Sequence, residues 1–114
     1  MYALIRIGKP LWGKSGEIIQ RVRESLLPTL SRLPGFVSYD IISLPDDTLL
    51  AATLFDTKES ADQANQSFVI WVREQELASL FMKVPEPMVG EVLLHVTRRE
   101  EETFLLEPPA GEGR

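Results

Sequence analysis

Hydrophobic residues alternate with other residues in four segments of the chain and recur at helical spacing in two more. The alternation is typical of strands and predicts them at residues 2–8, 36–43, 48–55 and 88–97. Apolar residues three and four positions apart predict one amphipathic helix over residues 15–33 and a second helical region between Asp56 and Pro85. The order strand, helix, strand, strand, helix, strand predicts an α+β, ferredoxin-like fold with a four-stranded antiparallel sheet.

Proline and glycine mark the corners of this pattern. Leu33-Pro34-Gly35-Phe36 ends the first helix and opens the second strand. Pro28 lies inside that helix, so we expect a bend at about the preceding turn. Ser15 is the expected cap at its start.

The second helical region has a less regular pattern. Asp56, with Glu59 three residues later, fits a capping box, and Thr57 and Ser60 are rival caps. The apolar stripe is interrupted at residues 66–67, where we expect a break or a change of register.

Both helices of this fold cover one face of the sheet, which leaves the other face bare. Assigning the more apolar side of each strand to the helices places these residues inward: Ala3, Ile5, Ile7, Val37, Tyr39, Ile41, Leu50, Ala52, Leu54, Val92, Leu94 and Val96. The bare face then still carries Leu4, Ile42, Leu49, Phe55 and Leu93. A soluble monomer rarely exposes such a patch, so the pattern predicts a homodimer that packs sheet on sheet.

Composition limits the class of protein. The 114 residues fit one domain, expected over residues 1–97, with a C-terminal tail at 98–114 that is rich in proline, glycine and glutamate and expected to be partly disordered. The net charge of −5 without a basic cluster argues against nucleic-acid binding. No apolar run is long enough for a membrane span, and the lack of cysteine and of a signal-like start favours a cytoplasmic location.

Candidate catalytic groups are few. His95 is the single histidine, and strand alternation places it on the same side as Arg6 and Glu91. Such a cluster could serve as an acid–base site, with His95 and Arg6 as catalytic residues, or as an ion-pair network across a dimer interface. Both interpretations stay open.

Candidate binding residues lie mainly on the second helix. Phe68 and Trp71 could form the floor of a pocket for a planar molecule, or belong to an ordinary core. Asn65 and Ser67 could bond a ligand carbonyl, or bond the backbone, and Tyr39 completes the predicted set of substrate-binding residues. Trp12, in a glycine- and proline-containing loop, is expected at a pocket mouth or against a partner subunit.

Motifs for cofactors and metals do not occur. The chain has no glycine-rich phosphate loop, no nucleophile elbow and no spacing of metal-ligating residues, so we expect neither a cofactor nor a metal.

The split topology, the Leu33–Phe36 corner, the strand end Phe55-Asp56 and the helix start Lys58-Glu59-Ser60-Ala61 together resemble the antibiotic-biosynthesis monooxygenase superfamily. The resemblance covers about residues 1–97 and rests on structural motifs. It implies ferredoxin-like dimers that form an α+β barrel, with a small pocket between sheet and helices in each subunit. Where this superfamily often has a histidine followed three residues later by serine, the chain has Ala64 and Ser67, which argues against a mechanism that depends on that histidine.

The activities that the resemblance implies are cofactor-independent oxygenation of aromatic polyketides, quinone chemistry and oxidative haem breakdown. The first strand offers Arg6 rather than asparagine and the second helix has no histidine, so we do not expect haem breakdown. The resulting hypothesis is a cofactor-independent monooxygenase-like protein that acts on an aromatic or quinol-type small molecule. The alternative is a homodimeric binding or scaffold module without enzymatic activity.

Overall fold

The computed structural model describes residues 1–98 and has the predicted order of elements. Four strands form one antiparallel sheet in the order β2-β3-β1-β4. Their bounds are β1 (Tyr2–Pro10), β2 (Phe36–Ser43), β3 (Leu49–Phe55) and β4 (Phe81–Glu91). The ferredoxin-like fold and the β2–β3 hairpin are therefore confirmed, and β1 lies between β3 and β4.

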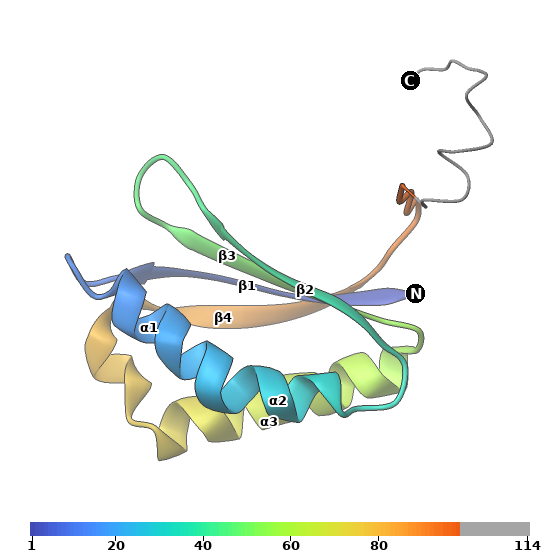
Figure 1. Ribbon diagram of the computed structural model, residues 1–114, viewed down its shortest axis with the longest axis horizontal. Coiled ribbons are helices and arrows are strands. Elements are labelled where there is room, and N and C mark those ends of the chain that lie inside the picture. Colours follow the sequence, from blue (N-terminus) through green and yellow to red (C-terminus); the bar gives the residue numbers. More distant parts are fainter. Residues whose placement is uncertain (99–114) are drawn as a thin grey trace.

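The helices all lie on one face of the sheet, and no element of residues 1–98 covers the opposite face (Figure 1). The first helical segment comprises α1 (Ser15–Arg21), a π-helical turn η1 (Val22–Leu26) and α2 (Leu27–Ser31). The second comprises α3 (Lys58–Glu74) and a 3₁₀ turn η2 (Leu77–Leu80). None of the helices in residues 1–98 combines the length and the apolar character that a membrane crossing requires.

The irregularity predicted at Pro28 takes the form of the π-helical turn. Proline has no N–H to donate, and its ring clashes with the carbonyl four residues earlier. The backbone widens before it, and the Leu27 N–H donates to the Val22 carbonyl, five residues earlier. Val22 and Leu26 stay buried, so the turn keeps its apolar side on the sheet.

The corner at Leu33–Phe36 is confirmed and connects the two halves of the fold. Gly35 has φ of +78°, which a residue with a side chain adopts only with strain. The Gly35 carbonyl accepts from the Asp56 N–H at 2.8 Å, and the Pro34 carbonyl accepts from Ser60 Oγ at 2.6 Å. The end of the first helical segment is thus bonded to the start of α3.

Two details of the helix predictions are wrong. Ser15 is the first helical residue rather than the cap, and α3 continues without a break through residues 66–67, because Ala61, Ala64 and Phe68 keep one buried face. Of the rival caps of α3 it is Thr57 that acts, with its side-chain oxygen accepting from the Ser60 N–H at 3.2 Å.

The bounds predicted for the last strand are also wrong. The second helical region is expected to end at Pro85, but Pro85 and Pro87 both lie inside β4. Since β4 is an edge strand, a residue without an N–H can occupy it with that side turned away from the ladder. The strand ends at Glu91, and residues 92–97 lie beyond it.

The sides assigned to β1 and β3 are reversed. The helices cover Leu4 and Arg6 of β1 and Thr53 and Phe55 of β3, which are all buried. For β2, Tyr39 and Ile41 pack on the core as predicted. Both sides of β1 and β3 are largely apolar, so alternation alone could not decide between them.

The uncovered face is consequently more apolar than predicted. Its apolar residues are Ala3, Ile5, Ile7, Ile42, Leu50, Ala52, Leu54 and Met88, and the polar residues Ser38, Asp40 and Glu86 lie on the same face. Ile7, Ile42 and Met88 are exposed among them.

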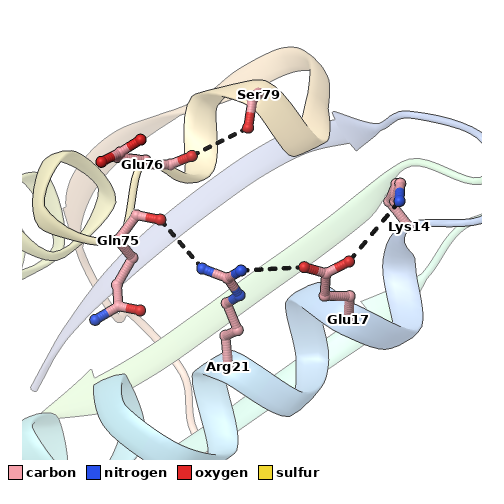
Figure 2. A network of polar contacts seen from close by, with 6 residues as sticks. All are labelled: Lys14, Glu17, Arg21, Gln75, Glu76 and Ser79. Carbon is pink, nitrogen blue, oxygen red and sulfur yellow. Dashed lines mark hydrogen bonds and ion pairs between the residues drawn. The ribbon is translucent and has the colours of Figure 1, made fainter.

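A hydrogen bond from Arg21 fixes α1 against the end of α3, and an ion pair within α1 orients that arginine (Figure 2). Arg21 donates to the Gln75 carbonyl at 3.1 Å and pairs with Glu17 at 3.1 Å, and Glu17 also lies 3.9 Å from Lys14. A cation at the last carbonyls of a helix is favourable because the dipole is negative there. The contact holds the two helical segments together at one end of the core.

The predicted C-terminal tail begins at Arg98, and the rest of it, 99–114, lies outside the described residues.

Candidate functional site

A cavity of about 40 Å³ lies between the sheet and the helices, as the resemblance implies. Its walls come from β1, β2, β3 and β4, from the first helical segment, and from α3. The lining residues are Arg6, Ile18, Val22, Leu26, Tyr39, Ile41, Leu49, Ala51, Phe68, Trp71, Val72, Phe81 and Pro85. Arg6 is the one member of this set that carries a charge at neutral pH.

Arg6 is buried at the centre of the sheet, with an exposed fraction of only 2%. Its Nη2 donates to Thr53 Oγ1 at 3.2 Å. The guanidinium carbon lies 4.7 Å from the centroid of the Phe68 ring and 5.2 Å from that of Tyr39. Nε and Nη1 are buried without a hydrogen-bond partner among residues 1–98.

The charge of Arg6 is costly in this place. Burial lowers the pKa of Arg6, an effect that the nearby Tyr39 opposes, but guanidinium stays protonated at neutral pH. Moving an ion out of water costs several kcal/mol, whereas a cation–π contact contributes about 0.5–2 kcal/mol. Within residues 1–98 Arg6 forms no ion pair with a carboxylate. Two aromatic faces and one hydroxyl therefore offset only part of the cost.

Tyr39 complements Arg6 as a neutral group. Burial raises the pKa of Tyr39, and the adjacent guanidinium opposes this rise. The phenol therefore stays protonated at neutral pH and can donate a hydrogen bond, but it is a poor proton acceptor. Arg6 and Tyr39 both line the apolar cavity, and a guanidinium beside a protonated phenol is a pairing that stabilises negative charge on an oxygen.

The π-helical turn holds Trp71 in the cavity wall. Ser25, within that turn, accepts a hydrogen bond from Trp71 Nε1 at 2.6 Å and donates to the Arg21 carbonyl at 2.9 Å. The rings of Trp71 and Phe68 lie 6.3 Å apart between centroids, at 35°. A buried indole N–H needs such a partner, so Ser25 fixes the ring that forms one side of the site.

Gly8 allows the β4 side of the cavity to close. A Cβ at Gly8 would lie 2.5 Å from Pro85 Cγ, a distance that real contacts do not reach. The absence of a side chain there lets the Pro85 ring pack directly on β1 and line the cavity.

A wider depression of about 290 Å³ adjoins this cavity. The two share Val22, Tyr39, Ile41 and Leu49 as walls. The depression is completed by Ile19, Arg23, Leu27 and Ser43, from the first helical segment and β2. The inner cavity and the outer depression therefore adjoin each other across shared walls, and we call the two together the Arg6 pocket.

Four of the seven predicted site residues line the Arg6 pocket, namely Arg6, Tyr39, Phe68 and Trp71. Asn65 and Ser67 lie on α3 outside its lining, although Asn65 Oδ1 is buried without a hydrogen-bond partner among residues 1–98. Val22 and Leu26 belong to the apolar stripe of the helix predicted over residues 15–33, and a cavity wall has the same apolar signal as a core. Ser25 and Thr53 carried no signal, because their role depends on the π-helical turn and on the side of β3 that faces inward.

The predicted cluster of His95, Arg6 and Glu91 does not form. Arg6 lies under the helices, while His95 is exposed in the segment after β4 and Glu91 is exposed at the strand end opposite Tyr2. The prediction failed because the last strand ends earlier than expected and β1 has the opposite side inward. Trp12 is 94% exposed and does not line the Arg6 pocket.

Residues 1–98 contain no group of three or more histidine, aspartate or glutamate side chains placed to hold a metal ion.

Comparison with known proteins identifies the fold. No protein-family model matches the sequence, and no curated protein matches it. Solved structures do match. A Nitrosomonas europaea protein assigned to the antibiotic biosynthesis monooxygenases superposes with a TM-score of 0.66 at 16% identity, over 82% of this chain and all of that one.

Two further structures agree. An assigned antibiotic biosynthesis monooxygenase of Chloroflexus aurantiacus gives a TM-score of 0.61 at 19% identity, over 84% of this chain and 96% of that one. A variant of SnoaB, a cofactor-independent oxygenase from Streptomyces nogalater, gives a TM-score of 0.66 at 12% identity, over 85% of this chain and 97% of that one. The resemblance expected from the sequence is thus confirmed: the chain has the fold of the antibiotic biosynthesis monooxygenases.

Replacement of Arg6 by methionine tests whether this residue holds the fold together. Because the guanidinium is buried without a carboxylate partner in residues 1–98, we expect Arg6→Met to leave the free energy of unfolding unchanged or to raise it. Leu4→Ala, on the same side of β1 and also fully buried, should lower it by about 2–5 kcal/mol. Urea unfolding at one fixed protein concentration measures both. A loss for Arg6→Met as large as that for Leu4→Ala would show that Arg6 is a structural residue.

Proposed function

We propose that the chain is a cofactor-independent monooxygenase-like protein that oxidises an aromatic or quinol-type small molecule in the Arg6 pocket. The observation that carries the proposal is a buried cation, with two nitrogens unpartnered among residues 1–98, beside a cavity walled by aromatic and aliphatic side chains. The fold shared with a structure named as a cofactor-independent oxygenase supports it.

The chemistry asks two things of the protein. In oxygenation without a cofactor, the electrons that reduce O₂ come from the substrate, most readily from its enolate or phenolate form. An anthrone, for example, consumes one O₂ while its CH₂ becomes C=O and one water is released. The protein has to bind flat rings and to stabilise the anion. Phe68 and Trp71 are placed to bind the rings, and Arg6 is placed to stabilise the anion. An apolar cavity also excludes water from the reactive anion.

A second candidate function is a binding module that catalyses no reaction. One observation favours it: the described lining of the Arg6 pocket contains no histidine or carboxylate that could accept a proton. The lining contains one phenol, that of Tyr39, and burial raises its pKa. A substrate that is not already acidic would therefore lack a general base in this lining.

Oxygen uptake distinguishes the two functions. The purified protein is incubated with a panel of dihydroxynaphthalenes and anthrones, and O₂ is followed with an electrode. We expect protein-dependent uptake with at least one member, a loss of about 10²-fold or more in kcat/KM in Arg6→Met, and no change in His95→Ala, since His95 is exposed and outside the site lining. No uptake with any member would contradict the monooxygenase proposal and favour the binding module.

We further propose that the chain is a homodimer that buries the uncovered sheet face of each copy. This face carries the apolar set of Ile5, Ile7, Ile42, Leu50, Leu54 and Met88, which no element of residues 1–98 covers (Figure 1). An apolar patch of this kind is unusual on a soluble monomer. An antiparallel sheet with helices on one side buries such a face by packing on a second sheet.

A matched pair of substitutions tests the dimer. Ile42 on the uncovered face and Ile70 on the outer side of α3 are both 47% exposed. Ile42→Glu should convert the dimer to monomer, because it places a charge in the apolar interface, whereas Ile70→Glu should leave the dimer intact. Sedimentation equilibrium at micromolar concentration measures the mass. A monomeric parent protein, or equal effects of the two variants, would contradict this interface.

A further inference from the structure

We infer that the ligand of the Arg6 pocket is an anion: a flat aromatic molecule that enters with an ionised oxygen, a carboxylate or a phenolate, and places this oxygen against Arg6. The inference rests on the proposed function, because it specifies the substrate class of the same site. It is carried by the charges that line the pocket and by the unused donors of Arg6.

The first observation is the sign of the charge. The chain as a whole contains 17 acidic and 12 basic residues, so an average surface depression would contain carboxylates. The described lining of the Arg6 pocket contains none, and its two charged members are both arginines, Arg6 in the inner cavity and Arg23 at the outer depression. A concave region with low-dielectric walls concentrates the field of such charges. The pocket therefore favours an anion within a protein of net negative charge.

The second observation is the unused hydrogen-bonding capacity of Arg6. Nη2 donates to Thr53, but Nε and Nη1 are buried without a partner in residues 1–98. These two atoms belong to a planar guanidinium whose N–H groups match the oxygens of a carboxylate. An anionic oxygen is the group that compensates both the missing hydrogen bonds and the buried charge.

The third observation is the shape of the pocket. The inner cavity, of about 40 Å³, has room for a small polar group, whereas the outer depression, of about 290 Å³, has room for rings. The rings would contact Ile41, Leu49 and Val22, the walls that the two regions share. The ligand is thus oriented with its acidic oxygen inward and its apolar body outward.

An anionic ligand also explains how a site without a general base in its described lining can act. A molecule that arrives ionised needs no proton acceptor, and the raised pKa of Tyr39 is then an advantage, because the protonated phenol donates to an oxygen rather than repelling it.

Calorimetric titration of the full-length protein at pH 7 tests the inference with two pairs of probes. In each pair an anion is compared with a neutral molecule of similar shape. The carboxylate pair is 2-naphthoate and 2-naphthamide, and the phenolate pair is 2,4-dinitro-1-naphtholate and its methyl ether. We expect the anion of at least one pair to bind about tenfold or more tightly than its neutral partner, and the pair that does so identifies the acidic group.

Two variants assign the preference to Arg6. Arg6→Met should remove the preference for the anion, because it weakens the binding of the anionic probe and leaves the binding of the neutral probe unchanged. Arg32→Met removes the same charge from an exposed position after α2, outside the pocket lining, and should leave the preference intact. Three results would overturn the inference: equal binding within both pairs, a preference that survives in Arg6→Met, or no binding of any probe at millimolar concentration.

The outcome is separable from that of the oxygen-uptake experiment. Binding of an anion through Arg6 without any O₂ uptake would refute the monooxygenase activity alone. Uptake with neutral anthrones that Arg6→Met leaves unchanged would refute the anionic ligand alone.

Discussion

The burial of one positive charge in an apolar interior is the constraint on which the site depends. Arg6 lies at the middle of β1, one of the two inner strands, where both helical segments cover it and it is 2% exposed. Its neighbours are two aromatic rings and one hydroxyl, which offset only part of the cost of removing guanidinium from water. An aliphatic side chain at this position would stabilise the fold better than arginine does. The energetics therefore point to a ligand that compensates the buried charge of Arg6.

The rest of the scaffold holds the walls of the pocket around that charge. The π-helical turn before Pro28 keeps Val22 and Leu26 on the cavity and presents Ser25 to the indole of Trp71. Arg21, one residue before this turn, fixes the first helical segment to the last carbonyls of α3. π-Helical turns occur frequently at functional sites, and here the turn has an identifiable cause in the proline and an identifiable effect in the position of a tryptophan.

Much of the fold could be predicted from the sequence, and less of the site. The order of elements, the Leu33–Phe36 corner and the buried helix face of Ile18, Val22 and Leu26 follow from periodicity and turn residues. The inward side of β1 and β3 does not follow, because both sides are apolar: one faces the helices, and no described element covers the other. For this reason Arg6 was predicted on the bare face of the sheet, whereas it lies under the helices. The prolines inside the edge strand β4 obscured its start in the sequence pattern. The last strand was therefore predicted too late in the chain, where it included His95.

The central claim is that Arg6 makes the pocket electrostatically positive, and the ionisation of a bound phenol measures this most directly. The pKa of 4-nitro-1-naphthol, read from its absorbance, can be compared in free solution, in complex with the parent protein and in complex with Arg6→Met. A neighbouring cation lowers a phenol pKa, whereas apolar burial raises it. We predict a bound pKa about one unit or more below the free value in the parent protein, and none below it in Arg6→Met. A bound pKa at or above the free value in the parent protein would contradict the account.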